Sequence, residues 1–60
     1  MDNMLYSLIE TGEFSYKSYL VKLVGRQDKY EVYDKFERLV FSRPANAIAY
    51  WALENFLESL

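Results

Sequence analysis

Neither cysteine nor histidine occurs in this chain of 60 residues, so hydrophobic burial has to hold its fold together. Small domains usually reinforce their core with disulfides or a structural zinc ion. Without cysteine no disulfide can form, and without cysteine and histidine the usual zinc ligands are missing. A chain of this length buries only about 60% of the surface that it exposes when unfolded. Such domains often gain stability by association. We therefore expect one small domain, residues 1–60, that forms a homodimer.

Aromatic residues are unusually frequent in so short a chain. The eleven rings are Tyr6, Phe14, Tyr16, Tyr19, Tyr30, Tyr33, Phe36, Phe41, Tyr50, Trp51 and Phe56. An interior this small cannot easily hold all of them together with the aliphatic side chains. Tyrosine and tryptophan are enriched at protein interfaces, where they combine a large apolar area with a polar group. We therefore expect some of the rings to lie on a contact surface.

A short helix is predicted at the start of the chain. Asp2 or Asn3 can act as its N-cap, and Gly12 can end it, because glycine readily adopts the left-handed conformation of a helix terminus. Four apolar residues share one stripe of this helix: Met4, Leu5, Leu8 and Ile9. This spacing is typical of a helix that packs one side against a core.

A longer helix is predicted over residues 45–60. Ser42 lies in its N-cap region, and Pro44 lies near the first turn, where the missing N–H of proline costs nothing. One face consists of Ile48, Trp51, Ala52, Phe56 and Leu60, with Ala49, Leu53 and Leu57 beside it. Because this apolar stripe is wide, we expect the helix to contact neighbours on more than one side.

The middle of the chain favours strands. Residues 15–24 and 30–41 are dense in Tyr, Val and Phe, which are common in strands. The polar segment 25–29 separates the two runs, and residues 34–37 can turn 30–33 back against 38–41. The sequence therefore predicts a small α+β domain, α-β-β-β-α, with a three-stranded antiparallel sheet and a long C-terminal helix.

A helical middle is the alternative. Tyr16, Tyr19, Leu20, Leu23 and Val24 also fit the spacing of one helix face. The pairs Glu31–Lys35 and Asp34–Arg38 are correctly oriented to stabilise a helix. An all-α bundle therefore stays open beside the α+β domain.

The chain offers little for catalysis. No histidine can activate any of its five serines, and no S-x-x-K motif occurs. Glu31, Asp34 and Glu37 are spaced by three, but Lys35 and Arg38 lie among them, which favours a neutralised surface. We expect a non-enzymatic protein without metal or cofactor.

The expected compartment is the cytoplasm. The apolar runs are far shorter than the roughly 20 residues that a membrane-spanning helix needs. Residues 1–10 carry acids where a secretory signal carries basic residues. The sequence therefore predicts neither a membrane span nor a signal peptide.

Positive charge is concentrated in the middle of the chain, although the net charge is −2. All seven Lys and Arg residues lie between residues 17 and 43, together with only four of the nine acids. Aromatic side chains can stack unpaired bases while cations hold the phosphates. A weak nucleic-acid-binding domain that uses the basic, Tyr-rich segment 16–43 is therefore the alternative function. Its candidate contacts are Tyr16, Lys17, Tyr19, Lys22, Arg26 and Lys29.

The predicted order of elements resembles that of the double-stranded-RNA-binding domain. The segment ANAIAYWALENFL, residues 45–57, is similar to the Ala-rich last helix of that family. The resemblance implies RNA as a partner. The family's lysine cluster at the start of this helix would fall at residues 43–46, where only Arg43 is basic, so most of the phosphate clamp is missing.

Contact with another protein is the function that the sequence favours. The C-terminal helix carries more large apolar side chains than one short core needs, and an uncovered patch would promote aggregation. The candidate interface residues are Tyr50, Trp51, Leu53, Phe56, Leu57 and Leu60. We expect them to bind a second copy of the chain and an unidentified partner protein. Size and composition are typical of regulators and inhibitors from phages and other mobile elements.

Overall fold

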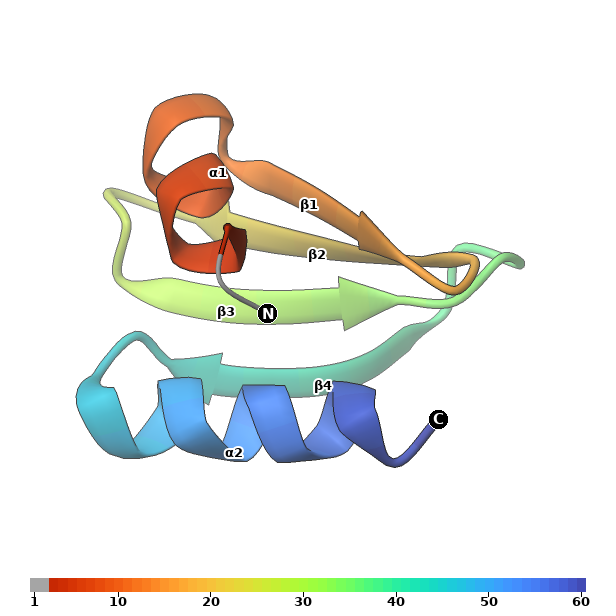
Figure 1. Ribbon diagram of the computed structural model, residues 1–60. Coiled ribbons are helices and arrows are strands. Elements are labelled where there is room, and N and C mark those ends of the chain that lie inside the picture. Colours follow the sequence, from red (N-terminus) through yellow and green to blue (C-terminus); the bar gives the residue numbers. More distant parts are fainter. Residues whose placement is uncertain (1–2) are drawn as a thin grey trace.

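The computed structural model describes residues 3–60 and has the order α-β-β-β-β-α (Figure 1). Its elements are α1 (Met4–Thr11), β1 (Glu13–Tyr16), β2 (Tyr19–Val24), β3 (Lys29–Tyr33), β4 (Leu39–Pro44) and α2 (Ala47–Glu58). The strands form one antiparallel sheet in the order β1-β2-β3-β4. The predicted α+β class is confirmed, with four strands in place of three. Neither of the helices described in residues 3–60 is long and apolar enough to cross a membrane.

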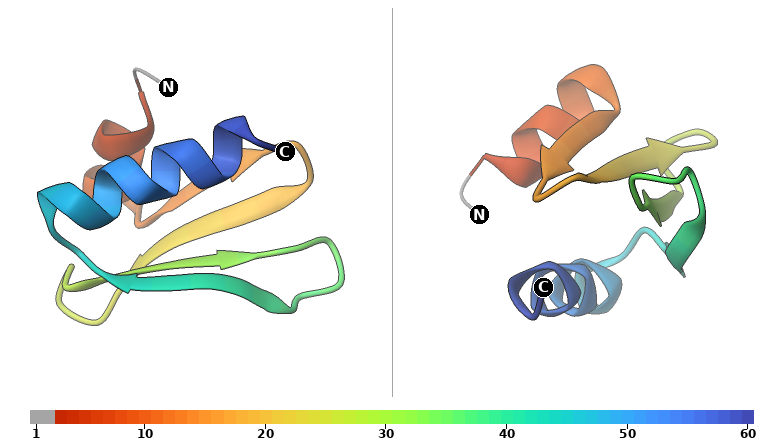
Figure 2. Two further views of the ribbon diagram at one scale, coloured as in Figure 1. Left: turned by 90° about the horizontal axis from the view of Figure 1, so that it is seen from below. Right: turned by 90° about the vertical axis from the view of Figure 1, so that its right-hand side faces the viewer.

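One face of the sheet carries the core. Successive residues of a strand point to opposite faces, and the register places Phe14, Val21, Val32 and Phe41 in one row across the four strands. Both helices lie on one side of the twisted sheet (Figure 2). The fully buried large side chains are Met4, Leu8, Val21, Val32, Leu53 and Leu57. Thus α1, the middle of the sheet and α2 share one small core.

The additional strand, β1, depends on a tight turn that the sequence did not indicate. Tyr16 pairs with Tyr19, so only Lys17 and Ser18 connect β1 to β2. Both turn residues have positive φ, 47° and 69°, as a type I′ turn requires. Such turns usually contain Asn-Gly or Asp-Gly, a signature that Lys-Ser lacks. The run 15–24 is therefore divided between two strands, and the helical alternative is wrong.

The first helix is confirmed, with half of its predicted stripe buried. Asn3 occupies the N-cap without a side-chain hydrogen bond, and Asp2, the other predicted cap, lies outside the described residues. Gly12 ends the helix with φ of 82°. The buried residues are Met4 and Leu8, whereas Leu5 and Ile9 are exposed. A helix of eight residues thus contacts the core along a narrow stripe.

The second helix begins later than predicted. β4 continues through Pro44, and Asn46 is the N-cap of α2. The side-chain Oδ1 of Asn46 accepts a hydrogen bond from the backbone N–H of Ala49 at 2.7 Å. The predicted cap, Ser42, is instead a residue of β4, so this prediction is wrong. A side-chain acceptor three residues before the donor is typical of an N-cap.

The buried face of α2 also differs from the predicted one. Its buried residues, Ala49, Leu53 and Leu57, are spaced by four. Ile48 and Trp51, which the spacing places on one helix face with Phe56, are 81% and 66% exposed. The rings of Tyr50 and Phe56 flank the buried face and pack against the core. Rotating the helix to bury Trp51 would move one of these flanking rings away from the core.

Candidate contact surfaces

Large apolar side chains stay exposed in three parts of the described chain. They are Leu5, Tyr6 and Ile9 on α1, Phe36, Leu39 and Val40 around the β3–β4 connection, and Ile48, Trp51 and Leu60 on or after α2. Charged residues accompany two of these groups: Glu54 and Glu58 lie in the second half of α2, and Lys35 and Arg38 lie beside Phe36. These two surfaces are therefore the candidates for binding.

The predicted interface residues divide between core and surface. Leu53 and Leu57 are fully buried, Tyr50 and Phe56 are half-buried, and Trp51 and Leu60 are exposed. The ring of Phe56 lies 5.2 Å from that of Phe41 on β4, measured between centroids. Leu53 and Leu57 consequently stabilise the fold and are not accessible to a partner. Only Trp51 and Leu60 remain fully on the surface.

The outer face of α2 consists of Ala47, Ile48, Trp51, Asn55 and Glu58, all of which are exposed. Ile48 and Trp51 are separated by three residues, so their side chains are neighbours on the helix. Sequence reasoning placed both residues on one helix face but named only Trp51 as an interface residue. The exposure of Ile48 could not be inferred from the spacing, because the apolar stripe extends around most of the helix.

The charges of α2 oppose its own dipole. The helix has no acidic residue in its first turn and no basic residue in its last turn. Its two charged residues, Glu54 and Glu58, lie in its second half, and the preceding cation in the chain is Arg43. The end of a helix carries partial negative charge and its start partial positive charge. This part of the molecule therefore has a positive start and a negative end.

The free edge of β4 is protected against the addition of another strand. The register shifts between Val32 and Tyr33, which disturbs the regular ladder next to this edge. Pro44 has no N–H to offer, and Nη1 of Arg43 donates to the backbone carbonyl of Ser42 at 2.9 Å. Proline, bulges and charged side chains are the usual devices that prevent strand pairing at an edge. A partner is therefore expected at a side-chain surface and not at this backbone.

On the face of the sheet away from the helices, Glu31 is paired within the molecule with Lys29 and Tyr33. Glu13, Lys22, Glu31 and Ser42 form one row across the strands. The hydroxyl of Tyr33 donates to Oε1 of Glu31 at 2.8 Å, which lowers the pKa of Glu31 and raises that of Tyr33. In residues 3–60, no group of three acidic side chains is placed to hold a metal ion.

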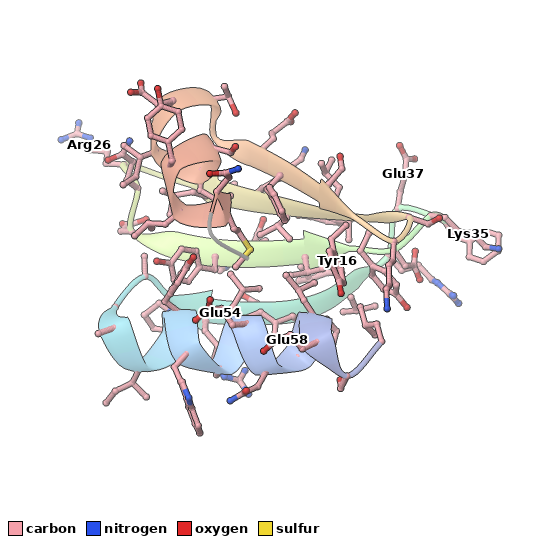
Figure 3. All side chains as sticks on the ribbon, viewed as in Figure 1. Tyr16, Arg26, Lys35, Glu37, Glu54 and Glu58 are labelled. Carbon is pink, nitrogen blue, oxygen red and sulfur yellow. The ribbon has the colours of Figure 1, made fainter. Side chains whose placement is uncertain are left out.

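The predicted nucleic-acid contacts do not gather on one surface. Lys17 lies in the β1–β2 turn, whereas Arg26 lies in the connection at the other end of β2. Figure 3 shows Arg26 at one end of the molecule and Tyr16 towards the other. Tyr16 and Tyr19 are half-buried on the face that the helices cover. Lys22 lies on the opposite face, and Lys29 pairs with Glu31.

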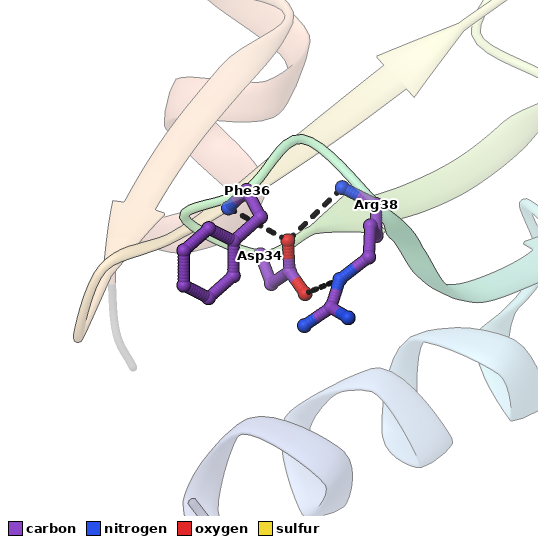
Figure 4. Close-up of polar contacts among 3 residues, drawn as sticks. All are labelled: Asp34, Phe36 and Arg38. Atoms are coloured by element: carbon purple, nitrogen blue, oxygen red, sulfur yellow. Dashed lines mark hydrogen bonds and ion pairs between the residues drawn. The ribbon is translucent and has the colours of Figure 1, made fainter.

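The β3–β4 loop, residues 34–38, is organised by one carboxylate (Figure 4). Oδ1 of Asp34 accepts hydrogen bonds from the backbone N–H groups of Phe36 at 2.8 Å and Arg38 at 3.0 Å. Oδ2 accepts a third from Nε of Arg38 at 2.8 Å. The Asp34 side chain is only 11% exposed, whereas Phe36 is 66% exposed. The loop therefore holds an aromatic ring in solvent by means of internal hydrogen bonds.

These hydrogen bonds make the loop sensitive to acid. The backbone N–H of Arg38 is the main cause that lowers the pKa of Asp34, and the Arg38 guanidinium adds to it. The resulting stabilisation is present above the unfolded pKa of about 4 and is lost as the pH falls through the lower folded value. Asp34→Asn should therefore destabilise the protein at neutral pH and have less effect as the pH falls. Urea unfolding across the acid range measures this, and a difference independent of pH would contradict it.

Two cations lie near the ring of Phe36, and a third lines the same hollow. Nζ of Lys35 lies 5.2 Å and Cζ of Arg38 lies 5.1 Å from the centroid of the ring. Lys17 approaches from the neighbouring β1–β2 turn, and its Nζ donates to the backbone carbonyl of Leu60 at 2.9 Å. A hollow of about 310 Å³, here named the Phe36 hollow, is lined by Lys17, Ser18, Tyr19, Asp34, Lys35, Phe36 and Arg38. Sequence reasoning named Lys17 and Tyr19 of this lining as nucleic-acid contacts but not Lys35, Phe36 and Arg38.

Comparisons with known proteins identify no relative. No protein-family model matches the chain, and no curated protein or solved structure is significantly similar to it. The resemblance to the double-stranded-RNA-binding domain is weakened by the additional strand β1 and by the position of Pro44, which ends β4 and lies outside the helix. The surfaces described above therefore carry the functional argument.

Proposed function

We propose that this protein is a non-enzymatic protein-interaction module that forms a homodimer through the outer face of α2. The adjacent exposure of Ile48 and Trp51 on one helix face carries this proposal. Tryptophan is one of the side chains that most often dominate the energy of a protein interface. A few well-packed residues near the centre of an interface carry most of its binding energy, so Ile48 and Trp51 from each copy can supply the centre of a contact.

Charge complementarity favours a second copy as the occupant of this face. If two α2 helices pack antiparallel about a twofold axis, the positive start of one copy lies beside the negative end of the other. Arg43 of each copy then faces Glu58 of the other, and the contact occurs twice because the dimer is symmetric. Glu54 and Glu58 lie towards the negative end of their own helix, which is unfavourable. In the antiparallel arrangement they also lie near the partial positive charge at the start of the other helix, which is favourable.

The dimer is proposed to act in the cytoplasm as a regulator or inhibitor that binds a partner protein. The small size and the aromatic-rich composition of the chain support this role. The proposed mechanism is steric: the bound protein covers part of the partner's surface, and no covalent bond is made or broken.

The proposed dimer predicts a strong effect of Trp51→Ala on association. Sedimentation velocity from low to several hundred micromolar should show dimers of the parent protein, and Trp51→Ala should weaken dimerisation at least tenfold while leaving the circular dichroism spectrum unchanged. Tyr6→Ala is the matched control, because Tyr6 is 68% exposed on α1, outside the α2 outer face. A parent protein that stays monomeric throughout, or equal effects of both variants, would refute this interface.

The antiparallel arrangement has a separate test in a charge exchange. Glu58→Arg should weaken the dimer, because it brings two cations together at both ends of the contact. The double variant Arg43→Glu with Glu58→Arg should restore association, since the opposite charges then face each other again. A double variant that associates less than Glu58→Arg alone would exclude the antiparallel arrangement. That outcome would not contradict the role of Trp51 in the interface.

A further inference from the structure

We propose that the Phe36 hollow binds a nucleotide unit, meaning a phosphate together with an unpaired base. The inference rests on the juxtaposition of one exposed ring with three cations from two separate turns. It goes beyond the proposed dimer and is independent of it, because a single copy forms the whole hollow. The unit can come from a free nucleotide or from a single strand of RNA or DNA, since both present the same chemistry.

The cations of the hollow are available to a phosphate. Lys35 and Arg38 extend from the β3–β4 loop, and Lys17 extends from the β1–β2 turn that ends at the same side of the sheet. Arg38 pairs with Asp34 through Nε, so its two Nη groups can still donate to a ligand. Lys17 uses one donor for the carbonyl of Leu60 and keeps two others.

The acids of the loop offset only part of this charge at the hollow, because Asp34 also lines it and pairs with one of the three cations, Arg38. Asp34 is nearly buried and uses both oxygens to accept hydrogen bonds within the loop. The side chain of Glu37 points in a different direction from that of Lys35 (Figure 3). Glu37 lines a second hollow, together with Leu20 and Lys22, and does not line the Phe36 hollow. The Phe36 hollow is therefore the more positive of the two.

The ring of Phe36 is placed to stack a base. It remains 66% exposed although two cations lie near it, and the hydrogen bonds of Asp34 hold its backbone in place before any ligand arrives. Preorganisation of this kind reduces the entropy that is lost on binding. Aromatic side chains among cations are the usual platform for unpaired bases, because every base has a face that can stack.

The size of the hollow indicates one nucleotide unit. Its volume of about 310 Å³ is near the lower end of the roughly 300–1,000 Å³ that is usual for small-molecule sites. Bases in a duplex are already stacked and paired, so their faces cannot contact Phe36. We therefore expect selectivity for a single strand over a duplex, with weak binding of any one unit.

Binding can be measured by fluorescence anisotropy with labelled ten-nucleotide strands of oligo-dT and oligo-U at low salt, and by NMR titration with AMP and with inorganic phosphate. We expect saturable binding of the strands, with NMR shifts centred on residues 34–38. Phe36→Ala should weaken binding at least fivefold, and Phe36→Tyr should retain it because the ring is kept. Lys35→Ala should weaken binding and reduce its salt dependence.

Lys29→Ala is the matched control, because it removes one half-exposed cation, paired with Glu31, from the end of β3 opposite to the hollow. It should have little effect, and so should Trp51→Ala, which separates this proposal from the dimer. Tighter binding of the strand than of AMP identifies a single strand as the source, and equal binding identifies a free nucleotide. The proposal is overturned by absence of binding at low salt, by equal losses in Phe36→Ala and Lys29→Ala, or by equally tight binding of poly-glutamate.

Discussion

Replacing Leu53 by alanine should lower the free energy of unfolding by about 3 kcal/mol, within the range of about 2–5 kcal/mol that is usual for such changes. Leu53 is fully buried in the core that α1, the sheet and α2 share. Alanine would lose the transfer energy of the side chain and leave a cavity. A domain of this size has a total stability of roughly 3–9 kcal/mol. We therefore expect the variant to lose roughly a third or more of its stability.

Urea unfolding followed by circular dichroism measures this loss. If Leu53→Ala lacks a folded baseline, Leu53→Val provides a smaller change of the same kind. Ile48→Ala is the matched control on the same helix, because Ile48 is 81% exposed. Its effect should stay within about 0.5 kcal/mol at concentrations too low for dimers, since surface substitutions rarely exceed this. Equal losses in the two variants would mean that α2 buries a different face.

Removing the cap of α2 should have the second largest effect on the free energy of unfolding. Asn46→Ala is expected to cost about 1 kcal/mol, within the usual range of about 0.5–2 kcal/mol, because the N–H of Ala49 loses its acceptor. Asn46→Asp should retain most of the stability, since a carboxylate accepts the same hydrogen bond and favours the helix start. Thermal and urea unfolding of the three proteins, measured at one concentration, provide the comparison.

Ser42→Ala is the control for the cap, because Ser42 is the residue that the sequence placed in this role. Its side chain makes no cap in the described structure, where Ser42 lies within β4. We expect a smaller change than for Asn46→Ala. A larger loss from Ser42→Ala would show that the helix begins earlier in solution.

The order of the elements could largely be read from the sequence, because it depends on local properties. Gly12 ends α1, and the dense Tyr, Val and Phe residues of the middle form strands. The turn within residues 34–37 was also identified, from its polar residues alone. The tight turn at Lys17 and Ser18 was missed because positive φ at both positions is unusual for these residues. Pairing between β1 and β2 imposes this conformation on them.

The candidate surfaces were harder to predict, because strand residues alternate between two faces. Tyr19 and Lys22 are close in sequence, but Tyr19 lies on the covered face and Lys22 on the other. Conversely, Lys17 and Lys35 are eighteen positions apart and line the same hollow. Clustering along the sequence therefore grouped cations that the fold separates. It also missed Phe36, whose exposure depends on the hydrogen bonds of Asp34.

The absence of cysteine and histidine, together with the excess of rings, predicted a domain held by hydrophobic burial with some aromatic side chains exposed, as Tyr6, Phe36 and Trp51 are. Local periodicity and capping residues were sufficient for the class of the fold. Only the tertiary structure decided which face of α2 is buried, which rings are exposed and which cations meet. The physical reason is that a wide apolar stripe offers several faces of similar hydrophobicity. Competition among Tyr50, Trp51 and Phe56 for one small core selects among them, and that competition is not local in sequence.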